Sequence, residues 1–204
     1  MRRGIVSDMT ARCAHITRHT RETQIEATLD LDGRGHAKVD IPLPFLKHMF
    51  ELFARHSLFD LHLQARGDLD VDHHHTVEDI GLVLGEALDR ALGDRAGIAR
   101  YGHSLLPMDE SLSLVAVDLG GRPYLVFEMA TRRRKILDFD LGLIEEMLRA
   151  FATQARMNLH VVHLYGREPH HAYESVFKGL ARALRMACAL DPRERGVPSS
   201  KGRI

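Results

Sequence analysis

The sequence predicts an α+β fold made by internal duplication, and three observations support this prediction. Period-two alternation typical of strands and 3.6-residue periodicity typical of helices follow one another along the chain. The order strands, helix, strand, helix occurs twice. Each half also carries the pattern His-His-x-x-Glu before its last helical segment, at 74–78 and 170–174, 96 positions apart. That period exceeds the length of solenoid repeats and indicates duplication of a domain-sized unit, and hairpin strands mixed with helices favour a sheet with helices on one face.

The first half is expected to form strands at 11–19, 23–31, 36–41 and from residue 61, and helices at 45–56 and 76–92. Residues 24–30 alternate between apolar and polar side chains, as a strand with one buried face does. Gly33 and Gly35 mark the turn that follows. Pro44 suits the first turn of a helix and precedes apolar residues at helical spacing.

A break containing two glycines at 93–97 separates the halves, so we expect half-repeats at 1–95 and 96–204 that form one compact unit. The second half is expected to form strands at 112–117, 123–129 and 159–165 and helices at 141–155 and 172–190. The end of the chain, 196–202, is rich in Gly, Pro and Ser and is expected to be a loop or tail.

Composition limits the function classes. The 204 residues are 45% hydrophobic and 27% charged, which is enough to bury a core. The formal net charge is zero, which gives no support for a general nucleic-acid or acidic-membrane partner. Cys13 and Cys188 are distant and lack a CxxC partner, so we expect reduced thiols in a cytoplasmic protein. We expect neither a membrane span nor a signal peptide.

The paired His-His-x-x-Glu segments are candidate metal ligands. Residues four apart share a helix face, so His74 can point the same way as Glu78, whereas His75 points elsewhere and could serve a second ion. The same reasoning applies to His170, His171 and Glu174. Imidazole with carboxylate suits Mn, Fe, Co, Ni or Zn, and the lack of thiolates argues against a purely structural zinc site. Two equivalent copies therefore predict a two-ion site with open positions for catalysis.

An ordered series of motifs covers nearly the whole chain. They are Arg18-His19-Thr20-Arg21-Glu22-Thr23, Phe45-Leu46-Lys47-His48-Met49, 72–79, 97–102, Gly121-Arg122-Pro123, 166–178 and 196–202. Through these motifs the chain resembles the imidazoleglycerol-phosphate dehydratase family of histidine biosynthesis. The resemblance implies half-domains with a four-stranded sheet packed on two helices. It also implies a carbon-oxygen hydro-lyase that removes water from D-erythro-imidazole glycerol phosphate to give imidazole acetol phosphate.

The resemblance further implies two Mn²⁺ ions, or other divalent transition metals, in each active site. Matched position by position, the metal ligands are His48, His74, His75, Glu78, Glu146, His170, His171 and Glu174. Glu146 stands where many family members have a histidine, and a carboxylate also ligates Mn. Lys47 and His73 replace two aspartates of the family, which alters the hydrogen bonding around the ligands.

By the same resemblance, Glu22 is the general acid/base and Glu174 is a second catalytic residue. The implied substrate-binding residues, including the phosphate contacts, are Glu22, Arg100, Arg122, Lys178, Ser199 and Lys201. An imidazole ring held by two metal ions can release electrons that expel the hydroxyl on the neighbouring carbon. Family members are similar in forming shells of 24 subunits, so we expect trimers that assemble further, with active sites between subunits.

Three other functions remain open. A two-metal phosphatase or hydrolase would use metal-bound hydroxide as its nucleophile. A non-enzymatic protein would use the ions only to join subunits. The replacements at Glu146, Lys47 and His73 also leave open a catalytically inactive family member.

Overall fold

The computed structural model describes residues 11–131 and 134–204; the start of the predicted first half, 1–10, and residues 132–133 lie outside the described residues. The first half contains β1 (Cys13–His19), β2 (Thr23–Asp30), β3 (Ala37–Asp40), α1 (Pro44–Ser57), β4 (Asp60–Gly67) and α2 (His74–Leu92). Every strand and helix predicted for this half is therefore present. The predicted helix start at residue 76 is two residues late, because the helix already includes the two histidines.

The second half contains β5 (Tyr101–Met108), β6 (Ser111–Asp118), β7 (Tyr124–Glu128), β8 (Lys135–Ile136), β9 (Phe139–Asp140), α3 (Leu143–Gln154), β10 (Asn158–Tyr165) and α4 (Pro169–Ala187). Strand β5 and the small β8–β9 hairpin were not predicted. The last helix begins at Pro169 and ends at Ala187, three residues before the predicted limits at both ends. Pro169 lies in the first turn of this helix, where its missing N–H is tolerated.

The two halves have the same sheet topology. Strand order is β1-β2-β4-β3 in one four-stranded sheet and β5-β6-β10-β7 in the other. The hairpin registers also agree, because Cys13 pairs with Asp30 and Tyr101, 88 positions later, pairs with Asp118. The predicted duplicated α+β fold is confirmed.

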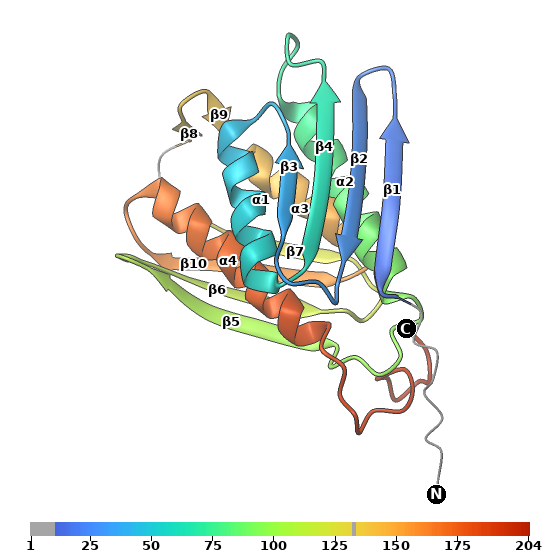
Figure 1. Ribbon diagram of the computed structural model, residues 1–204. Helices are drawn as coiled ribbons and strands as arrows, with labels where there is room; N and C mark the ends of the chain where they lie inside the picture. Colours follow the sequence, from blue (N-terminus) through green and yellow to red (C-terminus); the bar gives the residue numbers. More distant parts are fainter. Residues whose placement is uncertain (1–10, 132–133) are drawn as a thin grey trace, which may run out of the picture.

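The helices lie between the two sheets (Figure 1), and each shorter helix packs against the long helix of the other half. Helix α2 packs on β1, β2 and β4, whereas α4 packs on β5, β6 and β10. The shorter helices cross over, because α1 packs against α4 and α3 packs against α2. Side chains on α1 therefore meet side chains on α4, although more than one hundred residues separate them in sequence.

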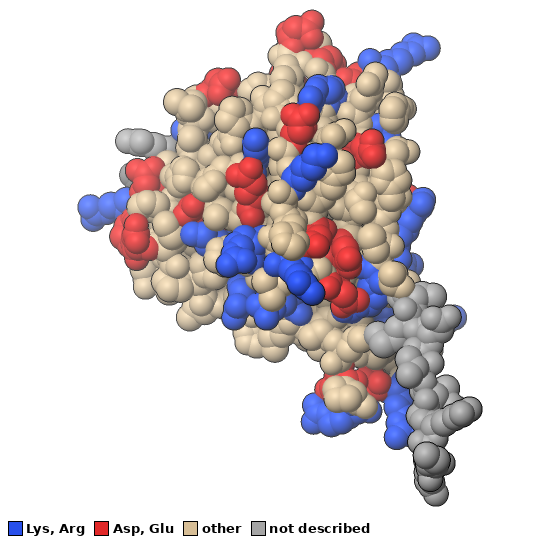
Figure 2. All heavy atoms as spheres, viewed as in Figure 1, with Lys and Arg blue, Asp and Glu red and all other residues tan. Residues whose placement is uncertain are grey.

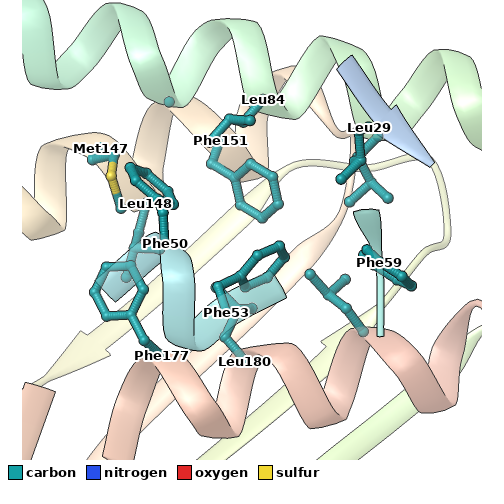
Figure 3. A pocket seen from close by; sticks show the side chains of 13 residues that line it. Leu29, Phe50, Phe53, Phe59, Leu84, Met147, Leu148, Phe151, Phe177 and Leu180 are labelled. Carbon is teal, nitrogen blue, oxygen red and sulfur yellow. The ribbon is translucent and has the colours of Figure 1, made fainter. Parts of the chain in front are cut away.

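The core between the sheets is apolar and continuous. Phe50 of α1 meets Phe177 of α4 edge to face, with ring centroids 6.1 Å apart. Figure 3 shows these rings with Phe53, Phe151 and other apolar side chains around a small internal cavity of about 20 Å³. Such a space is too small for a metabolite and is a packing feature of the helix layer.

One buried cation fastens the junction between the halves. Arg95 has only 1% of its surface exposed. Its guanidinium donates hydrogen bonds of 2.7 Å to the carbonyl oxygens of Leu119 and Ala155 and pairs with Asp89. Burial lowers the pKa of Arg95, so these acceptors are what make a buried guanidinium tolerable at this position.

Candidate metal centre

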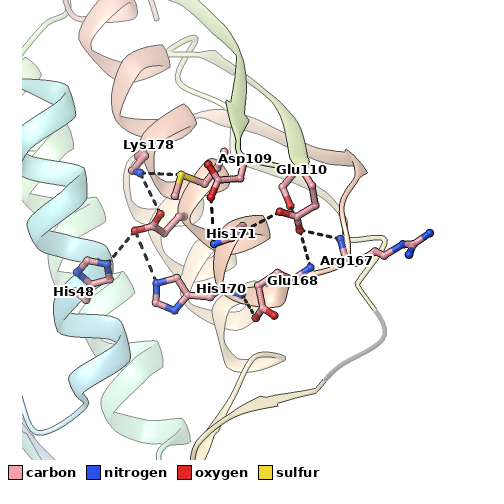
Figure 4. A network of polar contacts seen from close by, with 11 residues as sticks. His48, Asp109, Glu110, Arg167, Glu168, His170, His171 and Lys178 are labelled. Carbon is pink, nitrogen blue, oxygen red and sulfur yellow. Dashed lines mark hydrogen bonds and ion pairs between the residues drawn. The ribbon is translucent and has the colours of Figure 1, made fainter.

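Three potential ligands from both halves converge where α1 meets α4. The Nε2 atom of His48 lies 3.0 Å from Oε1 of Glu174, and the same carboxylate oxygen lies 3.9 Å from Nε2 of His170 (Figure 4). One ligand atom from each of the three residues falls within 4.8 Å of the others. Two imidazoles and one carboxylate form a donor set that suits a divalent transition metal.

The start of α4 holds this cluster in place. The carboxylate of Glu168 caps the helix by accepting a hydrogen bond from the backbone N–H of His170. The ring of His170 also packs edge-on against Phe45, with centroids 5.6 Å apart. One turn later, Glu174 is buried and its second oxygen accepts a hydrogen bond of 3.1 Å from Lys178. Burial opposes ionisation of Glu174, but hydrogen bonds from Lys178 and His48 outweigh it and lower the pKa.

The rings of the adjacent histidines are nearly perpendicular and have different partners. The His170 and His171 rings are at 89° to each other, and the His74 and His75 rings at 85°. Nδ1 of His171 lies 2.8 Å from a carboxylate oxygen of Glu110. This hydrogen bond raises the pKa of His171 and is the main reason that the pKa of Glu110 falls to about 2.

The first half repeats this arrangement with other partners. The Nε2 atom of His74 lies 3.6 Å from the carboxylate of Glu78, one helical turn later. The Nδ1 atom of His75 lies 3.1 Å from Asp68, whose hydrogen bond raises the pKa of His75. Glu22 is farther away, with its carboxylate 3.9 Å from the same nitrogen. Each His-His-x-x-Glu segment therefore has one histidine near its own glutamate and one against an outside carboxylate.

Glu146 is on α3, which runs beside α2. A Cβ atom placed on Gly81 of α2 would be 2.3 Å from the Met147 carbonyl oxygen, so the two backbones nearly touch there. Glu146 is exposed, and among residues 11–131 and 134–204 it does not join a three-ligand group with His74 and Glu78.

The predicted substrate residues lie in separate places, with Glu22 near His75 as described above. Lys178 lies beside Glu174 at the cluster. Arg100 pairs with Asp118 and donates a 2.8 Å hydrogen bond to the Pro198 carbonyl, which fixes the tail that carries Ser199 and Lys201. Arg122 lies in the loop before β7, where its carbonyl accepts a hydrogen bond from Asn158.

Asp68 and Glu110 are site residues that the sequence analysis missed. The carboxylate of each lies within hydrogen-bonding distance of Nδ1 of the second histidine of a pair. The available signal was the duplication itself, because Glu110 directly precedes β6 as Glu22 directly precedes β2.

Comparisons with known proteins identify the family of this chain. The model of the family "Imidazoleglycerol-phosphate dehydratase" matches residues 41–184. The chain belongs to the imidazoleglycerol-phosphate dehydratase family. The imidazoleglycerol-phosphate dehydratase of Methylorubrum populi is 55% identical over 194 residues, 95% of this chain and 100% of that protein. That of Geobacter metallireducens is 52% identical over the same shares.

Two solved dehydratase structures share the fold. The Staphylococcus aureus enzyme superposes with a TM-score of 0.78 at 35% identity, covering 88% of this chain and 99% of that one. The Pyrococcus furiosus enzyme, solved in complex with (S)-C348, gives 0.79 at 33% identity, covering 93% and 100%.

The chain therefore has imidazoleglycerol-phosphate dehydratase activity in histidine biosynthesis, which confirms this prediction over the hydrolase and assembly-protein alternatives. No helix within the described residues is both long and apolar enough to span a membrane. Acidic and basic side chains both occur across the face shown in Figure 2, in keeping with the zero net charge.

Proposed function

We propose that this dehydratase works with two Mn²⁺ ions held by His48, His74, His75, Glu78, Glu146, His170, His171 and Glu174. The observation that carries the proposal is the convergence of His48, His170 and Glu174 on one point from two helices. Nitrogen and carboxylate donors without thiolates fit manganese. When bound, the ions would act as Lewis acids toward the substrate imidazole ring.

The protein's own groups would then bind the substrate and move protons. Glu22 is the proposed general acid/base because it matches the family position for this role, and its side chain, 54% exposed, borders an open cavity of about 310 Å³ that a substrate can enter. Arg100, Arg122, Ser199 and Lys201 would bind the phosphate, with arginine offering paired donors. Lys178 would hold the second catalytic carboxylate, Glu174, in its ionised form while adding positive charge for the substrate phosphate.

We also propose that active sites are completed between subunits of a 24-subunit shell built from trimers. The outer face of the second sheet supports self-association, because it exposes large apolar side chains. These are Tyr101, Leu105, Leu114, Tyr124 and Leu164.

We further propose a boundary between the half-repeats at residues 95 and 96. In the chain, this boundary follows the last element of the first half, α2, and precedes the first strand of the second sheet, β5. The free thiols of Cys13 and Cys188 are compatible with a cytoplasmic enzyme.

Turnover of imidazole glycerol phosphate tests the metal mechanism. Wild type and Glu22→Gln are chelated, assayed, and assayed again after Mn²⁺ is added. We expect chelation to abolish activity and Mn²⁺ to restore it in the wild type alone. Full activity in the presence of chelator would overturn the proposal.

A further inference from the structure

Glu22 and Glu110 occupy the same position in the two halves. Each is the residue immediately before the second strand of its sheet. The registers of the two hairpins match with an offset of 88 residues, the distance from Glu22 to Glu110. The two carboxylates differ in the hydrogen bonds that they accept.

Glu110 is fully engaged by its own chain (Figure 4). Its Oε1 atom accepts hydrogen bonds from the backbone N–H groups of Glu168, at 2.8 Å, and Arg167, at 3.2 Å, just before α4 begins. Its Oε2 atom lies 2.8 Å from Nδ1 of His171. An ionised carboxylate can only accept, so Nδ1 carries a proton, and in the neutral imidazole Nε2 then keeps its lone pair. Asp109 lies 3.6 Å from that Nε2, which is beyond hydrogen-bonding distance.

Among residues 11–131 and 134–204, the Glu22 carboxylate makes no hydrogen bond of this kind, because Asp68 takes its place. Asp68 directly follows β4 and lies 3.1 Å from Nδ1 of His75, whereas Glu22 stays 3.9 Å away. The cavity beside these residues is lined by both Glu22 and Asp68. The carboxylate of Glu22 thus lies at the edge of an open space, without a hydrogen bond to the part of the chain that the structure describes.

The second half does not use the same solution. Tyr165 pairs with Leu112 as Arg66 pairs with Gln24, 88 positions earlier, so the register shift in β10 makes Arg167 the counterpart of Asp68. Arg167 has no carboxylate, and its backbone N–H donates to Glu110. The turn glutamate therefore takes the role that Asp68 has in the first half and reaches His171.

We propose that the duplication divided the work of the two turn glutamates: Glu110 is a positioning residue that fixes the His171 ring, and Asp68 positions His75, which leaves Glu22 free to move protons. The inference rests on the proposed metal function, because Nε2 of His171 is presented as a metal ligand. Outer carboxylates of this kind raise metal affinity by fixing the tautomer and ring direction.

The test compares Glu110→Gln, Asp68→Asn and Glu22→Gln. The Glu110→Gln amide retains an oxygen for the two backbone N–H groups, but its NH₂ group then faces His171 and places the proton on Nε2. We expect Mn²⁺ affinity to fall about 10–100-fold in Glu110→Gln and Asp68→Asn, with activity partly recovered at high Mn²⁺. Glu22→Gln should bind Mn²⁺ as the wild type does and remain inactive at every concentration.

Two readouts do not depend on turnover. Mn²⁺ titration followed by electron paramagnetic resonance gives affinity and stoichiometry, and ¹⁵N chemical shifts of the metal-free protein give the His171 tautomer. Wild-type Mn²⁺ affinity in Glu110→Gln, or an unchanged tautomer, would overturn the division of work. Wild type that binds no Mn²⁺ would instead overturn the proposed metal function, while the tautomer measurement would still report on Glu110 and His171.

Discussion

The two halves share a backbone plan but differ in the side chains at equivalent positions. On the outer face of the first sheet, Thr17 pairs with Glu26. At the same register in the second sheet, Leu105 pairs with Leu114, and both leucines are exposed. One sheet therefore presents a polar face and the other an apolar face.

The inner faces differ as well. In the first half, buried Asp79 accepts a hydrogen bond from Thr23 and pairs with Arg18 at 2.9 Å. Its counterpart in the second half is Ser175, whose hydroxyl lies 2.6 Å from that of Ser113. Shared topology brings the histidine pairs to matching places, whereas the surrounding residues give each half its own role.

Glu174→Ala should have the largest effect on fold stability and on Mn²⁺ affinity. Its counterpart in the first half, Glu78→Ala, tests whether the two halves respond equally. Glu174 is 8% exposed between His48 and Lys178, so its loss leaves a nearly buried Lys178 uncompensated and should destabilise the fold by about 3 kcal/mol. Mn²⁺ affinity should fall by more than about 100-fold, since a ligand itself is removed.

Glu78 is 47% exposed, so Glu78→Ala should change stability by less than about 0.5 kcal/mol while also weakening Mn²⁺ binding. Urea unfolding in chelator gives the stabilities, and Mn²⁺ titration gives the affinities. Equal losses of stability in the two variants would contradict the contrast between a buried and an exposed glutamate.

The sequence predicted what local periodicity controls. Strand β2 and helices α1 and α2 have one apolar face, so their patterns were clear. Strand β5 was missed because its alternation is obscured: Leu105 is exposed although apolar, and Pro107 lies within the strand. Exposed apolar residues violate the pattern that the prediction relies on.

The site shows the same limit. Spacing four along a helix predicted that His170 and Glu174 lie together. The approach of His48 to them depends on α1 packing against the helix of the other half, and only the family resemblance suggested it. The contact between Glu110 and His171 depends on hairpin register and on the approach of β6 to the start of α4, which no local pattern predicts.

The next largest effect on stability concerns the long helices α2 and α4. Gly81 of α2 and Phe177 of α4 each follow the first histidine of their pair by seven residues. Phe177 fills the α1–α4 contact, but Gly81 lets α2 approach α3. Gly81→Ala would place a Cβ atom 2.3 Å from a backbone oxygen and should destabilise by about 2 kcal/mol.

Gly196→Ala is a suitable control, because a Cβ atom there meets none of residues 11–131 and 134–204 within 4 Å. Thermal unfolding of both variants measures the difference. A Gly81→Ala variant as stable as the wild type would show that α2 and α3 can separate without loss.

A smaller effect should follow from giving the second sheet the outer pair of the first, through Leu105→Thr with Leu114→Glu. If the apolar face joins subunits, the dissociation constant between subunits should increase about tenfold, which corresponds to a loss of about 1.4 kcal/mol of association free energy. Sedimentation velocity over a concentration series measures this, and circular dichroism checks that the fold persists. Thr17→Ala on the polar sheet is the control, and an unchanged assembly in the double variant would exclude this face as an interface.

The smallest effect concerns acid stability, where His163 in the second half corresponds to Ala65 in the first. The two residues face Ser113 and Ile25, which are themselves equivalent. His163 is 3% exposed, and burial lowers its pKa below 6.5. As pH falls through 6.5, the unfolded chain takes up a proton that the folded chain excludes, so wild-type stability should decrease.

In His163→Ala this decrease should be smaller, even if the lost packing lowers stability at every pH. Urea unfolding in chelator between pH 5 and 8 gives the slopes, with exposed His160→Ala as the control. Parallel curves for wild type and His163→Ala would show that the buried imidazole does not make the second half more sensitive to acid than the first.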